Sequence, residues 1–458
     1  MQNNAKTNKI KKSLRYSIFD GVFYSAMVGI GESFFSAFAV FLKATSFQLG
    51  LLGSLPQLLG ALSQLFSNKI LDFTKSRKKV VLIGAFLQGL MYLPIALVFF
   101  FGRFQVFHLV FFICLYWIFS SVISPAWNSW MGDLVPENSR GSYFGKRNKF
   151  AGFASFFAFL IGGFILQRIG KEIPDAYVGF ALIFGAALAF RMISVIYLSK
   201  KYEPSFEMNK SQYFSFIEFI KKAGFNNYGM FVIYLSVFNF AVYIAAPFFS
   251  AYMLSDLKLS YLDFTIVTAT SLFAKFIMMP IWGKAADKFG SIKVLSLTGI
   301  LIAPVSLLWL FSHSLWYLIL IQIYSGFVWA GFEIASFKFI YDTTTPQKRP
   351  TCVAYYNVLN GIGMFAGAIV GSIILYHNNV FWSSFLLVFL VSSVARLLTT
   401  LFFLPRIKEV RHVESISKHE LFFNIVTTLP NQGIVHELIT FVNPSAKKDK
   451  LDFQIKKK

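Results

Sequence analysis

The chain has 458 residues, of which 56% are hydrophobic and 14% are charged, and its net charge is +22. A soluble domain typically has about 45–50% apolar and about 25% charged residues, so this composition excludes an ordinary soluble protein. The apolar residues gather in runs of about 20 or more, each long enough to cross a hydrocarbon core of roughly 30 Å as a helix. The lysines lie between these runs and in the tail, where positive charge indicates membrane orientation. We therefore expect no nucleic-acid partner.

The first apolar run follows a basic N-terminus and continues to about residue 43. A signal peptide has an apolar core of only about 7–15 residues. This run is longer and contains Asp20 and Glu32. We therefore predict an uncleaved first transmembrane helix.

The apolar runs predict an all-α membrane protein with 12 transmembrane helices. In chain order they lie at 18–43, 48–70, 79–101, 105–131, 148–168, 176–199, 227–253, 261–283, 292–312, 315–341, 352–376 and 379–404. The longest polar connection divides them six and six. The predicted organisation is an N-terminal segment 1–17, six spans in 18–199, a linker 200–226, six spans in 227–404 and a tail 405–458 with amphipathic segments.

Lysine and arginine are distributed unevenly between the two sets of connections. One set contains the N-terminus and clusters such as Arg77, Lys78 and Lys79, whereas the other contains only scattered cations such as Lys43 and Arg103. Cytoplasmic loops of membrane proteins carry an excess of these residues. We therefore expect both termini in the cytoplasm and the chain in the inner (plasma) membrane, with the tail on anionic lipid.

The two sets of six spans share an internal repeat, which is a feature of many transporter folds. The residues Asp133, Arg140, Asn148, Gly152 and Gly162 recur 209 positions later as Asp342, Arg349, Asn357, Gly361 and Gly371.

Small residues recur every four positions in two of the predicted spans. They are Ala154, Ala158 and Gly162 in the fifth span, and Gly363, Gly367 and Gly371 in the eleventh. Small residues at this spacing let two helix backbones approach closely in lipid.

A loop motif then points to a family. The second half reads Gly283-Lys284-Ala285-Ala286-Asp287-Lys288-Phe289-Gly290-Ser291-Ile292-Lys293, close to the pattern G-x-x-x-D-[RK]-x-G-x-x-[RK]. The first half keeps Asp72 but has Asn68 and Lys75 in place of the glycines. With the spans and the repeat, the chain resembles the major facilitator superfamily (MFS) over roughly residues 15–405.

The resemblance implies two pseudo-symmetric six-helix bundles around a central site and alternating access by rocking. The two stripes of small residues would then lie at the seam between the bundles. A tight turn after the second span of a bundle needs glycine, and an aspartate there can cap a helix or pair with a loop arginine. We assign a gating or structural role, with solvated loop charges as the alternative, to Asp72, Asp287, Gly283, Gly290, Asp133, Arg140, Asp342 and Arg349.

Ionisable residues inside a membrane are functional candidates by default. Glu32 lies about 14 residues into its span, so roughly 20 Å along it. In the family that the chain resembles, this span lines the cavity. We expect Glu32 to bind substrate or a coupling proton, the alternative being a static buried ion pair.

Three further candidates lie in the second half. Glu333 is expected deep in the tenth span, and Lys338 near the cytoplasmic end of that span. Lys275 in the eighth span would suit an anionic substrate, or would pair with Glu32 or Glu333. Arg191 and Arg396, placed similarly in the sixth and twelfth spans, are expected to support the scaffold.

Amides and aromatic residues on the predicted cavity helices form a weaker signal. Asn128 and Asn239, with nearby tyrosines and tryptophans, would bind a sugar or a flat organic solute, although aromatic belts at the membrane surface explain many of the rings equally well.

The sequence thus predicts a proton-coupled secondary transporter of a small solute, with import and export both open. The alternative is a non-transporting receptor, lipid-handling protein or assembly factor of the same fold. Enzyme motifs are absent from the sequence. We expect no cofactor or metal, partners limited to a small molecule, protons and lipid, and a monomer.

Overall fold

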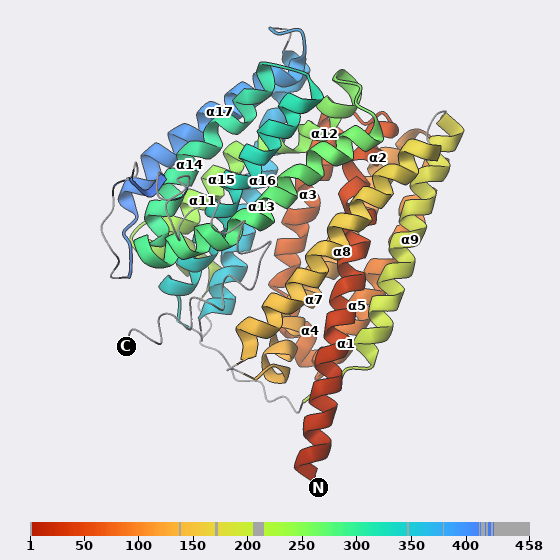
Figure 1. Ribbon diagram of the computed structural model, residues 1–458, viewed down its shortest axis with the longest axis vertical. Coiled ribbons are helices and arrows are strands. Elements are labelled where there is room, and N and C mark those ends of the chain that lie inside the picture. The colour runs from red at the N-terminus through yellow and green to blue at the C-terminus, as the bar shows by residue number, and fades with distance from the viewer. Residues whose placement is uncertain are drawn as a thin grey trace, which may run out of the picture.

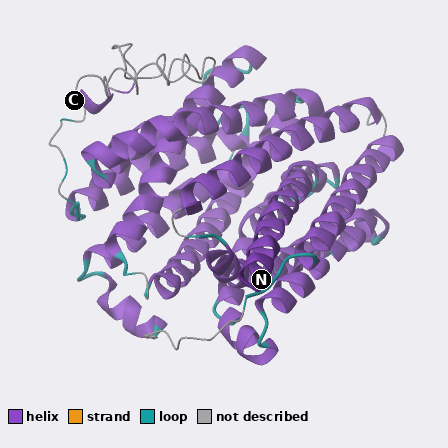
Figure 2. Ribbon diagram, turned by 60° about the horizontal axis from the view of Figure 1, so that its bottom comes forward, coloured by secondary structure: helices purple, strands orange, loops and turns teal. Residues whose placement is uncertain are grey.

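The computed structural model describes residues 2–136, 139–169, 173–204, 215–345, 348–378 and 380–411, together with 413, 417, 420–422 and 425. Within these residues the secondary structure is helical and includes no strand (Figure 2).

The helices fall into two halves on either side of the linker. The first half comprises α1 (Gln2–Ile30), α2 (Phe35–Phe41), α3 (Ser46–Gln64), α4 (Ser67–Thr74), α5 (Arg77–Leu90), α6 (Tyr92–Leu97), α7 (Gln105–Leu134), α8 (Arg140–Ile169) and α9 (Ile173–Ser199). The short α10 (Phe216–Ala223) precedes the second half. This second half comprises α11 (Asn227–Tyr243), α12 (Phe249–Ala251), α13 (Tyr261–Phe289), α14 (Ser291–Leu307), α15 (Leu315–Thr343), α16 (Arg349–His377) and α17 (Ser384–Phe403).

Eleven helical segments among the described residues are long and apolar enough to cross a membrane. They coincide with all the expected spans except the second, 48–70. That stretch is also helical, as α3 followed by α4, but it carries Gln48, Gln57 and Gln64 and is therefore more polar. Helix α3 packs on α7 of its own half and on α16 of the other.

Side-chain caps fix where many of the helices begin. Thr45 and Gln48 form a reciprocal capping box at the start of α3, and Ser76, Ser260 and Ser314 cap α5, α13 and α15. Such caps satisfy backbone N–H groups that have no partner within the helix.

The first span of each half is interrupted. Helix α1 ends at Ile30, and a 3-10 turn, Glu32–Phe34, leads into α2. Helix α11 ends at Tyr243, and a 3-10 turn, Ala246–Phe248, leads into α12. Irregular backbone at membrane depth is tolerated where it is enclosed by protein or lines a polar cavity.

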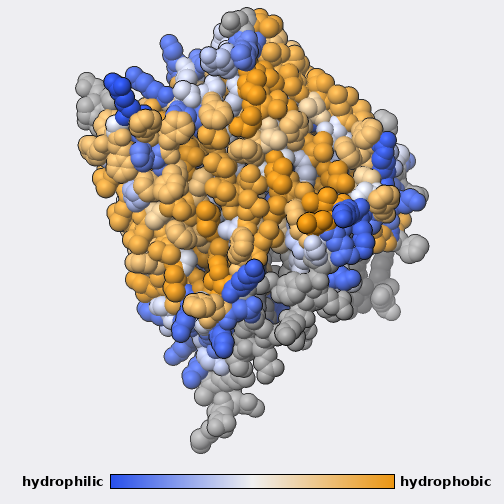
Figure 3. Space-filling model, turned by 180° about the vertical axis from the view of Figure 1, so that it is seen from behind, coloured by the Kyte–Doolittle hydropathy of each residue, from blue (hydrophilic) through white to orange (hydrophobic). Residues whose placement is uncertain are grey.

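The two halves lie side by side and meet along two seams (Figure 1). Helix α3 packs on α16 in one seam, and α8 packs on α13 in the other. The face seen in Figure 3 is a broad apolar surface with hydrophilic residues gathered towards its ends.

We call one end of the molecule the basic face. It carries the start of α1 and the connections α4–α5, α7–α8, α13–α14 and α15–α16, with most of the lysines and arginines. At the opposite end a single hydrophobic core contains residues of both halves, such as Phe38 and Tyr252. Towards the basic face each half has a separate core, represented by Trp130 in the first and Trp282 in the second. The halves are therefore joined at the opposite end and packed separately at the basic face.

Candidate functional site

Glu32 lies at the break of the first span and is only half-buried. The Tyr116 hydroxyl of α7 donates a hydrogen bond of 2.7 Å to its carboxylate. The Tyr92 ring contacts the Tyr116 ring edge-on, with ring centroids 5.5 Å apart. Among the described residues Glu32 forms no ion pair. The static ion pair considered for Glu32 is therefore not what the structure contains.

A second buried carboxylate, Asp20, lies three turns of α1 nearer the basic face. It accepts a hydrogen bond of 2.8 Å from Ser194 of α9, which itself accepts one of 3.2 Å from Arg191. Arg147 and Lys201 lie 3.8 and 3.7 Å from the Asp20 carboxylate. Asp20 therefore lies among cations.

Lys201 follows the end of α9 and is buried. Burial lowers the pKa of this lysine to about 8, against the opposing effect of Asp20. Its ammonium also lies over the Trp130 ring, 4.6 Å from the centroid. Burial disfavours the charged form of Lys201. The Asp20 carboxylate and the face of the Trp130 ring stabilise that charge.

In the second half, Lys275 of α13 forms an ion pair of 3.1 Å with Glu333 of α15. Of the two partners considered for Lys275, the structure selects Glu333. The side chains are 25% and 42% exposed, so the pair is not locked in dry packing. Tyr356 of α16 lies within electrostatic reach of Glu333.

Lys338, which the sequence grouped with the substrate or proton residues, lies apart from Glu333 and Lys275. It forms an ion pair with Asp287 at the basic-face end of α13. Five residues separate Glu333 from Lys338, so the two side chains point to different sides of α15. Lys338 therefore contacts the loop motif.

The two candidate asparagines are not brought together. Asn128 of α7 is exposed, and Asn239 of α11 donates a hydrogen bond to the Leu235 carbonyl of its own helix. A polar contact between the halves comes instead from Tyr243, whose hydroxyl lies 3.1 Å from the Gln57 side-chain oxygen. Sequence reasoning missed Gln57, although a glutamine inside an apolar run was a usable signal.

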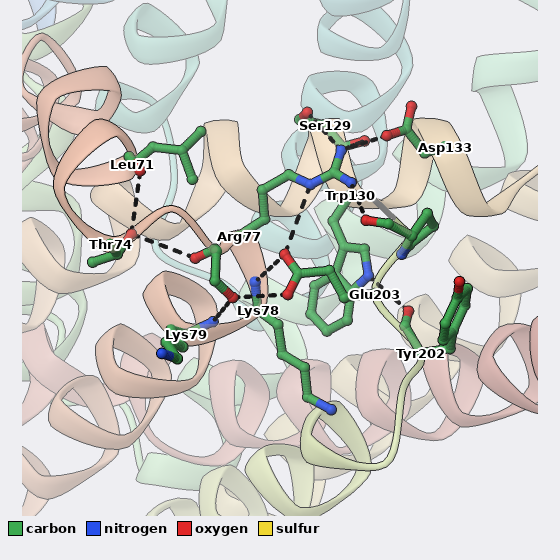
Figure 4. A network of polar contacts seen from close by, with 12 residues as sticks. Leu71, Thr74, Arg77, Lys78, Lys79, Ser129, Trp130, Asp133, Tyr202 and Glu203 are labelled. Atoms are coloured by element: carbon green, nitrogen blue, oxygen red, sulfur yellow. Dashed lines mark hydrogen bonds and ion pairs between the residues drawn. The ribbon is translucent and has the colours of Figure 1, made fainter. Parts of the chain in front are cut away.

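Arg77 is the central residue of a buried network at the basic face of the first half (Figure 4). Its guanidinium is fully buried and forms an ion pair of 2.5 Å with Asp133. It also donates hydrogen bonds to Ser129 and to the Pro204 carbonyl. Glu203 in turn accepts hydrogen bonds from the Lys78 N–H and the Ser76 hydroxyl, at 3.1 and 2.7 Å. Sequence reasoning used Arg77 only for orientation.

The recurring arginines make equivalent contacts in both halves. Arg140 donates to the carbonyls of Gly132 and Val135, and Arg349 donates to those at the equivalent positions, Tyr341 and Thr344. An arginine is favourable at the negative end of a helix dipole. The repeat therefore reproduces a contact of the first residue of α8 or α16 with the end of the preceding helix.

The loop aspartates differ between the halves. Asp287 contacts both Lys338 and Arg411, the latter at 4.0 Å. Arg411 follows α17 and also pairs with Asp342 at 3.2 Å. Asp72 is exposed and forms no ion pair with the described residues.

The glycines of the loop motif also have different positions. Gly290 has a φ of +93° at the turn between α13 and α14. Gly283 lies inside α13, where an added Cβ would approach Ile334 only to 4.0 Å. The expectation that the turn needs glycine applies to Gly290 and was wrong for Gly283, because the helix continues for six residues beyond it.

The stripes of small residues pack inside their own halves, so their assignment to the seam was wrong. An added Cβ at Gly363, Gly367 or Gly371 would meet a backbone oxygen of the α11 span at 2.3, 2.2 or 2.1 Å. Gly162, on the same face of α8 as Ala154 and Ala158, packs on the first span through Phe34. The stripes therefore face the first span of their own half, which is α1 in the first half and α11 in the second.

The seams are formed by residues next to the stripes. An added Cβ at Gly163 of α8 would lie 2.2 Å from the Thr265 hydroxyl of α13. On the other side, one at Gly361 of α16 would lie 3.1 Å from the Leu58 Cα of α3. Spans five and eleven thus border the other half, on a different face from the one expected.

The fold resembles that of several solved structures. Solved structures with similar folds include a mutant of the nucleoside transporter NupG, with TM-score 0.69 and 14% identity over 87% of this chain and 100% of that one. They also include the xylose transporter XylE from E. coli in a partially occluded inward open conformation, with TM-score 0.63 and 13% identity over 89% and 100% of the two chains. A search of curated protein sequences finds no match.

The family follows from the sequence profile that the chain matches. The profile of the Major Facilitator Superfamily matches it twice, over residues 20–244 and 230–442. Proteins of this family are transporters and not enzymes, and they move solutes across a membrane. The chain belongs to the major facilitator superfamily.

Proposed function

We propose that this transporter moves a small solute by alternating access and couples the movement to protons through Glu32. The observation that supports this most directly is a carboxylate at membrane depth, hydrogen-bonded to a tyrosine, with no ion pair among the described residues. An unpaired carboxylate is unfavourable in its charged form away from water. Glu32 therefore has reason to take up a proton in one transport state and release it in another.

The packing supports alternating access. One shared core at the end opposite the basic face and two separate cores towards it fit a state that is open towards the basic face. The excess of lysine and arginine on that face supports its location in the cytoplasm of an inner membrane. In the other state the halves would separate at the opposite end and close at the basic face.

The ion pair Lys275–Glu333 is proposed as a substrate contact in the second half. Both side chains are partly exposed, so a polar or anionic solute can compete for either partner. Asn128, Asn239 and the seam contact of Gln57 with Tyr243 are proposed as further polar contacts.

The contacts at the basic face are proposed to hold and release the gate. In the second half Asp287 and Asp342 share Arg411, and in the first half Asp133 is held by Arg77. Ion pairs that are arranged differently in two states can bias the equilibrium between them.

The experiment combines a ligand screen with flux. A thermal-shift screen of the purified chain against metabolite classes identifies a solute that stabilises it. Proteoliposomes are then loaded for two assays: accumulation driven by a pH gradient, and exchange of labelled for unlabelled solute at equal pH. We expect Glu32→Gln to lower gradient-driven accumulation by at least about tenfold, while exchange persists.

The matched control is Glu218→Gln, which removes an exposed carboxylate of α10 whose ion-pair partner among the described residues is Lys222, and which should leave both assays unchanged. Undiminished proton-driven accumulation in Glu32→Gln would contradict the coupling role. Absence of flux for every stabilising solute would contradict the proposal as a whole.

A further inference from the structure

The carboxylates of Asp20 in α1 and of Glu32 in the turn after α1 have unequal surroundings. Asp20 has Arg147 and Lys201 within 4 Å and is linked to Arg191 through Ser194. Glu32 has only hydroxyl and ring neighbours among the described residues. Three cations thus gather around one carboxylate of the first span, while the other has no cation within ion-pair distance among the described residues.

Asp20 and Tyr24 share one face of α1, because they lie four residues apart. Glu32 follows in the 3-10 turn beyond Ile30, and Tyr24 lies within electrostatic reach of it. Helix α9 packs along α1. Its Ala187 lies against Gly31, where an added Cβ would approach the Ala187 Cβ to 2.6 Å. Arg191 is one turn further along α9, about 5.4 Å nearer the basic face.

Arg191 lies between the two carboxylates. Its guanidinium lies over the Tyr24 ring, 4.8 Å from the centroid. The hydroxyls of Tyr24 and Tyr92 are within electrostatic reach of both Arg191 and Glu32. Arg191 is 3% exposed, and its Nε atom has no hydrogen-bond partner among the described residues. One turn of movement towards α2 would bring the guanidinium to the level of Glu32.

We propose that Arg191 is a positioning residue for proton coupling that exchanges partners between the Asp20 cluster and Glu32. The inference rests on the proposed proton binding by Glu32. With Glu32 protonated, Arg191 stays with Ser194 and Asp20, as in the described arrangement. When Glu32 loses its proton, the new negative charge attracts Arg191, and Asp20 remains with Arg147 and Lys201.

The other polar groups around the two carboxylates determine which cation can pair with Glu32. Glu32 faces Tyr116 of α7, Tyr92 of α6 and Tyr24 of α1. Asp20 faces Arg147 and Tyr143 of α8 and Lys201 after α9. None of these groups that face Glu32 is a cation, so Arg191 is the described cation best placed to neutralise it.

The exchange connects proton binding at Glu32 with contacts at the basic face. The Lys201 carbonyl accepts a hydrogen bond of 2.9 Å from Lys78, which belongs to the Arg77 network. Arg147 donates to the Ser17 carbonyl at 3.1 Å. Removal of Arg191 from the Asp20 cluster changes the charge balance of both contacts. The protonation state of Glu32 is thereby linked to the gating contacts at the basic face, and this link does not require bound substrate.

The test measures Glu32 directly and needs no transported solute. Dicyclohexylcarbodiimide modifies protonated carboxyl groups in apolar surroundings, and mass spectrometry of peptides separates modification at Glu32 from that at Asp20. Full-length protein in lipid is labelled at pH 8. We expect Arg191→Gln to label at Glu32 on the order of tenfold faster than the parent, because a nearby cation favours the unreactive carboxylate form.

The opposite sign is expected for substitutions on the other side of the exchange. Asp20→Asn and the milder Ser194→Ala release Arg191 from its present partner, so Glu32 labelling should slow several-fold. Arg191→Lys, which keeps the charge, should restore a rate near that of the parent. Arg168→Gln removes an exposed arginine at the far end of α8 and is the control.

Each outcome has a distinct meaning. Opposite shifts in Arg191→Gln and Asp20→Asn, with rescue by Arg191→Lys, support the exchange. Shifts in the same direction, or no shift, overturn it and leave Arg191 a structural residue. If Arg191→Gln does not fold, Ser194→Ala alone decides by whether labelling slows. Absence of Glu32 labelling in the parent at pH 5 and pH 8 would instead contradict the proposed proton binding itself.

Discussion

The loops at the basic face of the two halves make the same contacts with different residues. In each half a carboxylate beyond the last span caps the third span: Glu203 accepts from the Lys78 N–H at 3.1 Å, and Glu409 accepts from the Ile292 N–H at 2.9 Å. In each half an arginine also binds the recurring aspartate at the end of the fourth span. The repeat is therefore one of contacts more than of residue identities.

The source of the arginine differs between the halves. Arg77 is the first residue of α5 and is fully buried. Arg411 comes from the segment after α17, and its side chain is 34% exposed. The ion pair Arg77–Asp133, which we call the first clamp, thus lies within the first bundle. The ion pair Arg411–Asp342, the second clamp, depends on a segment beyond the last span. We infer that the second clamp is the more easily released.

The largest effect is expected from Arg77→Gln. The substitution leaves Asp133 without its cation and removes hydrogen bonds to Ser129 and Pro204. Removal of one partner of a fully buried ion pair typically costs about 3–5 kcal/mol, and because the Asp133 side chain is 50% exposed the low end of this range applies. We expect a fall of this order in the free energy of unfolding, measured by denaturation in detergent. A loss below about 1 kcal/mol would show that the first clamp is no more rigid than the second.

Next in size is Gly290→Ala, at the turn of the second half. Gly290 has φ +93° and ψ 153°, a region that is essentially restricted to glycine. The added Cβ would also lie 2.5 Å from the Glu409 carboxylate, which caps α14. We expect a loss of about 1–3 kcal/mol in the same assay. An unchanged unfolding midpoint would mean that this cap does not hold the turn.

The fold was largely predictable from the sequence, and the reason is physical. Runs of about 20 apolar residues must be helices that span the bilayer, because hydrocarbon offers no partner for backbone N–H and C=O groups. The loop motif and the repeat then indicated the family, which the profile match confirmed. The exception was the second span, where glutamines dilute the apolar run of a helix that packs against both halves.

The details of the site were harder to predict. Spacing places Lys338 near Glu333, but its partner Asp287 belongs to another helix. The role of Arg77 was hidden in a basic run that also marks orientation, and that of Arg411 in a tail expected to lie on lipid. Contacts between distant segments depend on which helix faces are paired. The stripes of small residues showed that two helices pack closely, without showing which two.

A smaller effect, with the opposite sign, is expected at the turn of the first half. Lys75 occupies the position of the second motif glycine and has φ +49°, in the left-handed region. A non-glycine residue is disfavoured there. Lys75→Gly should therefore raise the free energy of unfolding by up to about 1 kcal/mol. A decrease would indicate that the Lys75 side chain makes a stabilising contact at the basic face.

The smallest effect on stability, and the sharpest test of the comparison, is expected from Arg411→Gln. Its ion pairs with Asp287 and Asp342 are partly exposed, and such pairs contribute roughly 0–1 kcal/mol. The free energy of global unfolding should therefore change little. Loss of Arg411 should nevertheless loosen the neighbouring Glu409 cap, so the Ile292 amide should exchange its hydrogen several-fold faster in native-state exchange. The Lys78 amide, capped by Glu203 in the first half, is the internal control and should keep its rate. Equal hydrogen-exchange rates of the Ile292 amide in the variant and the parent would show that the segment after α17 stays in place without Arg411. The two clamps would then be equally difficult to release.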